Sequence, residues 1–400
     1  MRTNRSSVLP AKRSSVSFAR KWTPSPSDRF SVGKTSLSHP KLAFEVLSTA
    51  WTVSRVQTRR HTTLEWHDEE QMIKSCGRHL YREHLNDSQP EYIGAIPLPF
   101  WKQFLGSSKL CRRALRLMYF NVVPVTSNKF IVWFDKSLGV VKDGTFVPIM
   151  ERNPFRVLRQ GIVQTDSFIY FGEYFGNPNR DPVHIYRIRA SETPLSAEVI
   201  YTFPRGSIRH IHRIQQDPYS SELWCMTGDL PHECQILKSK DQFNTLDLVG
   251  GGDESWRSIS PLFTERSIFY ATDSEFDQNS IYRIDRVSGE RTLVTDIDGP
   301  VYYSTSIGDE LFFAVTAENC PSQISPHASV WHIREINEGV VKAEQLVRFQ
   351  KDFLDPKIFL PGTITFPSGP GNKSNALYFN TFALRTADFA TFKLSRTGCD

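Results

Sequence analysis

From about residue 116 onward the chain alternates apolar and polar residues, and this period of two predicts β-strands that bury one face. Four stretches repeat one plan: an apolar strand, a polar turn, and a second, aromatic-rich strand that ends at an acidic residue. Two further strand-like runs follow each stretch. The four stretches are 155–174, 208–229, 256–275 and 301–318, and their final acids are Glu173, Asp229, Asp273 and Glu318.

Weaker copies of this plan cover 116–149 and 358–395. Repeats of four short antiparallel strands, roughly 40 to 60 residues apart, are typical of a β-propeller, because one sheet cannot cover both of its faces and successive sheets stack into a ring. The sequence therefore predicts an all-β propeller over 116–397 with six four-stranded antiparallel blades, or seven if the preceding region contains strands. The last blade lacks a clear outer strand, which the segment near 119–125 or the earlier chain would supply.

The chain before residue 116 has a different composition. Residues 1–62 hold twelve Lys or Arg and two acids, a charge of +10, whereas the remainder carries −5. This Arg- and Ser-rich segment is predicted to be a disordered basic tail, and the negative remainder argues against a nucleic-acid surface. Apolar residues recur every three to four positions in 66–87, and again in 99–117 with a break near Gly106, so 63–115 is predicted to be a helical N-terminal segment.

The repeated acids are predicted to face a repeated basic position. In a propeller the first strand of a blade starts, and the second strand ends, at the same face of the ring, so these two positions meet at the mouth of the central channel. The start positions hold Arg156, Arg209, Arg257 and Tyr302, and Arg116 with Asp135 is a weaker fifth instance.

Two interpretations of this mouth stay open. Arginines and acids can neutralise one another in a ring of ion pairs, which contributes little stability at partly exposed positions. Alternatively, the arginines form a cup that binds carboxylates, sulfates or phosphates through their planar forks, with Trp256 and Tyr303 as stacking surfaces for sugar rings. If chemistry occurs there, the crowded carboxylates need separated pKa values. The candidate catalytic residues are then Asp229, Asp273, Glu173, Glu318 and Tyr302.

Histidines offer a further candidate at the same mouth. His210 and His212 share one face of a strand, because side chains alternate along it, and they join the ligand-binding candidates. Together with His184, His232 or a rim acid they would offer ligands for a divalent metal, whereas hydrogen-bonded structural histidines are the alternative. No other cofactor is predicted. The six cysteines form no CxxC pair and no zinc-like spacing, so reduced, packed thiols are expected.

One turn resembles a family motif. The stretch "SKDQFNTL" (239–246) is similar to the Asp-box, Ser-x-Asp-x-Gly-x-Thr-Trp, of the sialidase-like BNR-repeat propellers. In that family the motif is a structural turn between the third and fourth strands of a blade, so the resemblance implies the fold more than an activity. The match holds at Ser239, Asp241 and Thr245, and departs at Phe243 and Leu246.

The same resemblance bears on the mouth. Sialidases grip the substrate carboxylate with three arginines, and Arg156, Arg209 and Arg257 resemble that triad in type and blade position. The chain departs from sialidases in lacking their F/YRIP start and their several well-formed Asp-boxes. The pattern from "RHIH" to "IYRID" also resembles uncharacterised propellers associated with bacterial polysaccharide metabolism.

These observations predict that the mouth binds an acidic oligo- or polysaccharide. Hydrolysis or lysis of that glycan is the enzymatic form of the hypothesis, but no complete catalytic set can be named. The alternative is a non-catalytic scaffold for protein partners, in which each arginine is neutralised by the acid of its own blade. No apolar run approaches the roughly 18–20 residues that span a bilayer, no secretory signal is recognisable, and a cytoplasmic location is expected by default.

Overall fold

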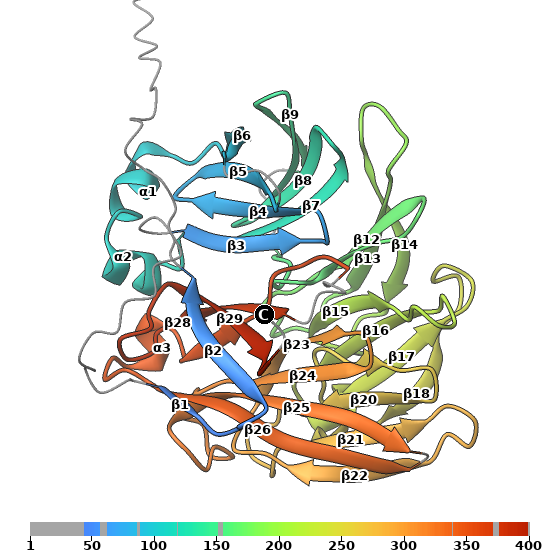
Figure 1. The fold of residues 1–400 in the computed structure, drawn as a ribbon. Coiled ribbons are helices and arrows are strands. Elements are labelled where there is room, and N and C mark those ends of the chain that lie inside the picture. The colour runs from blue at the N-terminus through green and yellow to red at the C-terminus, as the bar shows by residue number, and fades with distance from the viewer. Residues whose placement is uncertain are drawn as a thin grey trace, which may run out of the picture. The chain divides into compact units, whose positions relative to one another are not determined.

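The computed structural model describes residues 44–56, 62–85, 89–117, 119–150, 155–337, 339–370 and 376–398. The predicted disorder of residues 1–43 lies outside this part of the chain. The described residues form a β-propeller of seven antiparallel blades, each with at least four strands (Figure 1). The all-β propeller is therefore confirmed, and it has the seventh blade that was expected if the region before residue 116 contained strands.

The first four blades follow the chain from its innermost to its outermost strand. Blade 1 is β3 (Thr62–His67), β4 (Gln71–Cys76), β5 (His79–His84) and β6 (Glu91–Ala95); blade 2 is β7 (Phe120–Thr126), β8 (Lys129–Phe134), β9 (Ser137–Lys142) and β10 (Thr145–Met150); blade 3 is β11 (Ile162–Gln164), β12 (Phe168–Gly172), β13 (Val183–Arg189) and β14 (Ala197–Phe203); blade 4 is β15 (His210–Gln216), β16 (Leu223–Gly228), β17 (Gln235–Ser239) and β18 (Asp247–Gly251).

The last two blades borrow strands from the N-terminal part of the chain. Blade 5 is β19 (Leu262–Phe263), β20 (Ser267–Ala271), β21 (Ser280–Asp285) and β22 (Arg291–Asp296); blade 6 is β23 (Val301–Ile307), β24 (Glu310–Val315), β25 (His327–Asn337) and β26 (Val340–Gln350), with β1 (Phe44–Val46) as a fifth, outer strand; blade 7 is β27 (Thr363–Thr365), β28 (Ala376–Phe382) and β29 (Ala390–Arg396), with β2 (Trp51–Val56) as its outer strand.

The ring is closed by β2, which pairs antiparallel with β29 from Trp51 opposite Arg396 to Val56 opposite Thr391. Figure 1 shows the blue β2 beside the red β29. The missing outer strand of the last blade thus comes from the earlier chain, whereas the segment 119–125 lies in the first strand of blade 2. The prediction that the disordered tail extends to residue 62 is wrong for 44–56, because strand pairing supplies the backbone partners that this segment could not provide alone.

The predicted helix over 66–87 is also wrong, because its described residues belong to β3, β4 and β5 of blade 1. The buried side chains of β4 and β5 alternate, but a tight turn at Gly77, with a φ of +58°, separates the strands. The turn shifts the phase of the alternation between Ile73 and Leu80. The apolar residues of two consecutive strands therefore have the spacing of three to four residues that is typical of a helix.

Helices occupy two places in the described chain. Between blades 1 and 2 lie α1 (Phe100–Leu105) and α2 (Lys109–Ala114), which are separated at Gly106, where the sequence predicted a break. A short helix, α3 (Pro356–Phe359), precedes blade 7, and the 3-10 turns η1 (Pro231–Glu233) and η2 (Glu254–Trp256) flank β17 and β18. Among the described residues, no helix has the length and apolar character needed to cross a bilayer.

The hydrophobic core is divided among the interfaces between neighbouring blades. Six clusters of buried side chains each join two successive blades, from blades 1 and 2 to blades 6 and 7. At the interface of blades 7 and 1 the contact is polar. The Asn380 side chain accepts a hydrogen bond from the Leu64 N–H (3.1 Å) and donates one to the Leu64 carbonyl (2.8 Å). This stacking fixes the innermost strands around one centre.

Candidate functional site

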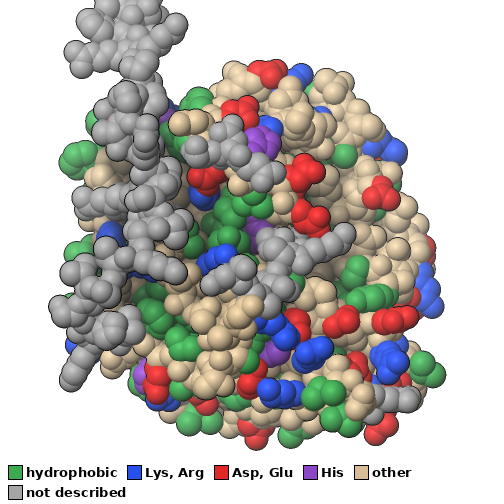
Figure 2. All heavy atoms as spheres, in the orientation of Figure 1, with side chains coloured by type: hydrophobic (Ala, Val, Ile, Leu, Met, Phe, Trp, Pro, Cys, Tyr) green, Lys and Arg blue, Asp and Glu red, His purple; other side chains and the backbone are tan. Residues whose placement is uncertain are grey.

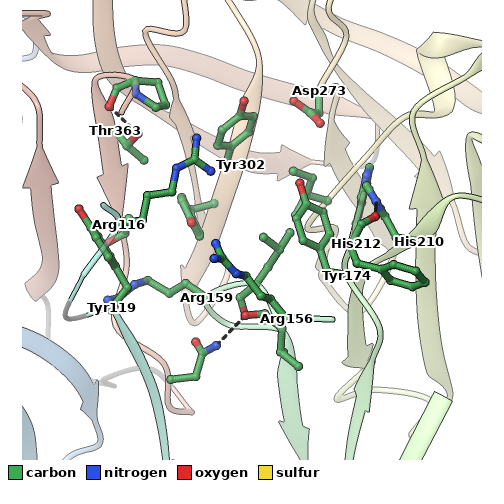
Figure 3. Close-up of a pocket in the computed structure, with 18 of the residues that line it drawn as sticks. Arg116, Tyr119, Arg156, Arg159, Tyr174, His210, His212, Asp273, Tyr302 and Thr363 are labelled. Atoms are coloured by element: carbon green, nitrogen blue, oxygen red, sulfur yellow. Dashed lines mark hydrogen bonds between the residues drawn. The ribbon is translucent and has the colours of Figure 1, made fainter. Parts of the chain in front are cut away.

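A cavity of about 490 Å³ lies where the inner strands of the blades meet. Most of the predicted mouth residues line it: Arg156, Arg209, Arg257, Asp229, Asp273, Glu318, Tyr302, Tyr303, His210 and His212. Arg116 and Asp135, the weaker fifth pair, line it as well. The topology therefore brings residues from six blades, blades 2 to 7, and from the loop before blade 2 to a single cavity (Figure 3).

Asp229 is the most heavily paired acid of the cavity. It follows β16 with a φ of +138°, outside the usual range of a non-glycine residue. Its Oδ2 lies 2.6 Å from Nη1 of Arg209, and its Oδ1 lies 3.3 Å from Nη2 of Arg257. Burial alone would raise the pKa of Asp229, but hydrogen bonds and charge interactions with His210 and His212 hold it well below its usual range.

Asp273 has the opposite electrostatic state. The carboxyl is buried, and this burial raises its pKa well above the usual value despite the Arg257 guanidinium, whose Nε lies 3.3 Å from Oδ2 of Asp273. The negative charges of Glu318 and Asp229 act in the same direction as burial. Two acids of one cavity are thus separated in pKa because only one of them collects enough cationic partners to offset burial.

The tyrosines beside these acids are held neutral. Burial raises the pKa of Tyr302 well above its usual value, and the charges of Asp273 and Glu318 raise it further. Burial likewise raises the pKa of Tyr303. The Tyr302 hydroxyl hydrogen-bonds the Glu318 carboxylate, so Tyr302 acts here as a hydrogen-bond donor rather than as a phenolate.

Arg116 and Arg156 also line the cavity (Figure 3). The nearest ion-pair partner of Arg156 is Asp135, with 3.8 Å between Nη2 and Oδ1, and the Arg156 side chain is 48% exposed. Asp135 lies much closer to Lys102, with 2.5 Å between Nζ and Oδ2. Arg116 is exposed, and its backbone has a φ of +51°. These two guanidiniums are therefore available to an anion that enters the cavity.

His210 and His212 extend from β15 on the other side of the cavity, with the ring of Tyr174 centred 4.2 Å from that of His210 (Figure 3). Nδ1 of His210 lies 2.9 Å from the carbonyl oxygen of Phe175, and Nδ1 of His212 lies 3.2 Å from that of Ser258. Burial lowers the pKa of His212, against the opposing effect of Asp229. Both histidines are thus anchored to neighbouring loops, with their Nε2 atoms directed to Asp229.

The structure does not bring Glu173 to the cavity. Glu173 is buried within blade 3, where its carboxylate accepts hydrogen bonds from the Tyr186 hydroxyl (3.0 Å) and the His184 N–H (2.9 Å). The residue paired with Arg156 is Tyr174, one position later, and Tyr174 lines the cavity instead. A shift of one residue moves a side chain to the other face of a strand, so the repeated acid of blade 3 points away from the mouth.

Trp256 is likewise placed elsewhere. It lies in η2 on blade 5, where its ring stacks on Tyr270 with 5.7 Å between centroids, and the Arg291 guanidinium lies 4.2 Å from the ring centre. A 3-10 turn precedes the start of the blade, so the ring of Trp256 packs on the blade's own sheet rather than facing the channel. The predicted sugar-stacking role of Trp256 has no place at the cavity.

Other lining residues were not predicted from the sequence. Tyr174 could have been found by counting strand positions back from the turn, because it occupies the place that Asp229 holds in blade 4. Arg159 and Tyr119 lie in irregular segments before β11 and β7, where no strand period locates a side chain. Arg159 is neutralised within the protein, since its Nη1 lies 2.6 Å from Oε2 of the buried Glu65.

The turn that resembles an Asp-box lies between β17 and β18, the third and fourth strands of blade 4. Asp241 accepts hydrogen bonds from the N–H and the hydroxyl of Thr245, at 2.9 and 2.8 Å, and the Ser239 hydroxyl accepts one from the Phe243 N–H at 2.8 Å. Phe243 has a φ of +70° where the motif has glycine, and its ring is buried against Tyr170. The motif residues therefore stabilise a turn far from the cavity-lining set.

No protein-family model and no curated protein matches the sequence. The folded chain is similar to a chain in the crystal structure of the mitotic checkpoint complex, with a TM-score of 0.50 and 11% identity over 92% of this chain and 99% of that one. It also matches a Mycobacterium tuberculosis puromycin-hydrolyzing peptidase, with a TM-score of 0.47 and 9% identity over 80% of this chain and 50% of that one. At such identity the likeness extends to the seven-bladed propeller fold alone.

Proposed function

We propose that the protein binds an acidic oligosaccharide in the central cavity. The observation that carries this proposal is the pair Arg116 and Arg156, two guanidiniums that line one side of the cavity and have no acid within 3.5 Å among the ion pairs of the described residues. Arginine holds carboxylates and sulfates through its planar fork, so two such groups favour an anionic ligand.

The charge of the lining supports this choice. Five arginines face four acids there, and burial disfavours the ionised form of Asp273 by raising its pKa. The outer surface of the protein differs from the cavity lining. On the face shown in Figure 2, basic and acidic side chains are interspersed over the described residues. The attraction for an anion is therefore local to the cavity, which favours a small acidic ligand over a long polyanion.

Size and aromatic content support a sugar as the ligand. A cavity of about 490 Å³ lies within the 300–1,000 Å³ typical of small-molecule sites. Tyr119, Tyr174 and Trp133 contribute rings to the lining. Aromatic faces pack against the apolar faces of sugar rings, while the tyrosine hydroxyls and the Asp273 carboxyl can hydrogen-bond sugar hydroxyls.

Binding is favoured over cleavage. Asp229 already contacts Arg209, Arg257 and two histidines, and its lowered pKa makes it a weak base and a weak nucleophile. Tyr302 is neutral for the reasons given above. A cleaving enzyme needs a free carboxylate beside a protonated one. Asp229 is occupied by cations, and Glu318 is engaged by the Tyr302 hydroxyl.

The test is a calorimetric titration of the purified protein with uronic-acid and sialic-acid oligosaccharides and with neutral oligosaccharides of equal length. We expect binding of the acidic series alone, and a loss of at least about tenfold in affinity in the double variant R116Q/R156Q, because two charge-assisted contacts are removed. The matched control is R205Q, whose guanidinium pairs with Asp181 in an exposed position and does not line the cavity. Equal binding by the double variant and the parent would refute the proposal.

A second candidate function is a scaffold for a protein partner, and the exposed face of α1 favours it. Phe100, Trp101 and Phe104 are 81%, 52% and 69% exposed. Figure 2 shows hydrophobic side chains at the surface on the side where Figure 1 places α1 and α2. Three exposed aromatic side chains on one short helix are unusual for a free surface and are typical of a protein interface.

This second candidate makes a separate prediction. A photo-crosslinking residue at position 101 is expected to capture one defined protein, and the variant F100S/F104S is expected to lose that capture while oligosaccharide binding in the cavity is unchanged. A crosslinking pattern that is the same at position 101 and at the exposed Val287 would contradict it.

A further inference from the structure

Three potential metal ligands converge at one end of the cavity. The ligand atoms of His210, His212 and Asp229 all lie within 4.8 Å of one another. Nε2 of His210 lies 3.5 Å, and Nε2 of His212 lies 3.4 Å, from the same oxygen of Asp229, Oδ1. Both imidazoles are buried, and they come from alternate positions of β15, so the strand itself sets their spacing.

Hydrogen bonding fixes which nitrogen of each ring faces the acid. A carbonyl oxygen can only accept, so Nδ1 of His210 must carry the proton that it donates to Phe175, and Nδ1 of His212 must carry the proton that it donates to Ser258. In a neutral ring Nε2 therefore presents a lone pair, whereas a hydrogen bond from Nε2 to Asp229 Oδ1 requires a second proton on the ring. A metal ion can take the place of that second proton. A metal-bound histidine has this same arrangement, with its other ring N–H held by a carbonyl or carboxylate.

A second observation points to a ligand at this place. Nε2 of His210 is buried and has no hydrogen-bond partner within the described structure, and the residue is only 3% exposed. A buried polar atom without a partner costs about 1–3 kcal/mol, so such atoms are rare unless something else binds them. A lone pair directed at a carboxylate is also repulsive, unless a cation lies between them.

We infer that His210, His212 and Asp229 form a binding site for a divalent first-row transition-metal ion. Metal–nitrogen and metal–oxygen bonds of about 2.1 Å at a tetrahedral ion place neighbouring ligand atoms about 3.4 Å apart, which agrees with the two distances to Asp229 Oδ1. Two imidazoles and one carboxylate are typical ligands of Zn²⁺ and Fe²⁺ sites, which keep further positions open. Those positions face the cavity, where an oxygen of a ligand can complete the coordination.

The arginines give this site an unusual property. Nη2 of Arg257 lies 3.3 Å from Asp229 Oδ1, and Nη1 of Arg209 lies 2.6 Å from Oδ2. A metal ion at Oδ1 competes with Arg257 but leaves the contact of Arg209 intact. Removing the charge of Arg257 is therefore expected to strengthen metal binding, whereas removing either histidine weakens it. If the three residues had a purely structural role, the arginine and histidine substitutions would not change metal binding in opposite directions.

The experiment uses tag-free, full-length protein that has been stripped with a chelator and then titrated with ZnCl2 by calorimetry and with CoCl2 by visible absorption. We expect one high-affinity ion per chain, with the intense absorption bands of Co²⁺ in a low-coordinate site. H210Q and H212Q should each weaken binding at least about 100-fold, since the loss of an outer-shell partner alone costs 10–100-fold. R257Q should tighten binding by about tenfold, because a like charge near the ion is removed.

The matched control is H232Q. His232 is an exposed histidine whose Nε2 lies 3.9 Å from the Glu233 carboxylate, outside the cavity-lining set. It should bind the ion as the parent does. Circular dichroism establishes that each variant is folded, and two independent histidine variants keep the test decisive if one of them is not.

The inference is overturned if the parent binds no ion, or if H210Q and H212Q bind it with the affinity of the parent. It does not depend on the proposed oligosaccharide, because the titration contains none. The two proposals can therefore fail separately: R116Q/R156Q should retain the metal, and H210Q should retain a share of the oligosaccharide affinity through the arginines.

Discussion

The substitution of Asp229 by Asn is the sharpest test of the electrostatics of the cavity, with Asp273→Asn as its partner. Asp229 is 16% exposed in its side chain and contacts Arg209 and Arg257. An amide keeps the shape of the carboxylate but leaves these cations facing each other without a countercharge. We therefore expect D229N to destabilise the fold and D273N not to destabilise it.

The magnitude follows from the burial of each partner. Breaking a buried ion pair costs about 3–5 kcal/mol. Arg257 is largely buried, so loss of its ion pair with Asp229 should account for most of this cost. Arg209 is 39% exposed, so loss of its ion pair should cost only about 0–1 kcal/mol because solvent screens it. D229N should therefore lower the free energy of unfolding by about 3 kcal/mol. D273N should not lower it at pH 7, because burial disfavours the Asp273 carboxylate in the folded state and an amide has no charge to bury.

The pH dependence of the two acids has opposite sign. The folded pKa of Asp229 is lowered, so its contribution to stability is present above the unfolded value of about 3.9 and is lost as the pH falls through the folded value. The folded pKa of Asp273 is raised, so the folded state holds a proton that the unfolded chain releases, and this group lowers stability as the pH rises above about 3.9. D273N should therefore gain stability relative to the parent between pH 4 and pH 7.

The assay is urea unfolding followed by tryptophan fluorescence at pH 4, 5 and 7, with EDTA present so that no metal ion contributes. The reasoning is refuted if D273N destabilises the protein as much as D229N does at pH 7. That result would mean that Asp273 is ionised and that its ion pair with Arg257 stabilises the fold.

Two further substitutions test the closure of the ring. W51A should lower the free energy of unfolding by about 3–5 kcal/mol, because the buried indole of β2 packs on Phe312 and ties the N-terminal strand to blades 6 and 7; the exposed W101A serves as control and should change it by less than about 0.5 kcal/mol. N380L should cost about 2–4 kcal/mol, because it leaves the N–H and the carbonyl of Leu64 without partners, and amide hydrogen exchange at the joint of blades 7 and 1 should increase. Urea unfolding of W51A that matches the parent would exclude a closing role for β2.

The fold was largely predictable from the sequence because strand repeats are local. Short apolar and aromatic strands separated by polar turns are written in consecutive residues, as in β20 and β21 on either side of residues 272–279. Blade 1 was the exception, since a tight turn at Gly77 shifted the phase of the alternation between β4 and β5. The outer strand of blade 7 was predictable only as a missing partner, because β2 lies more than 300 residues away in the sequence.

The candidate site was predictable where strand position alone directs a side chain. Arg209 and Asp229 are opposite each other across β15 and β16, so their meeting follows from the repeat. Glu173 shows the limit of this reasoning, because one residue of difference at a strand end reverses the direction of the side chain. Arg159 shows another limit, since it lies in an irregular segment and its partner Glu65 belongs to a blade that the sequence did not reveal.

By itself, the sequence determined that the chain forms a ring of four-stranded sheets and that basic and acidic residues gather at one mouth, since both properties depend on residues close in the sequence. Only the tertiary structure decided which arginines are neutralised, in which direction the pKa of each acid is shifted, and that His210, His212 and Asp229 converge. These properties depend on distances of a few ångströms between blades and on burial. The distances between blades and the burial of side chains are set when the seven sheets close around a common centre. A local sequence pattern therefore does not predict them.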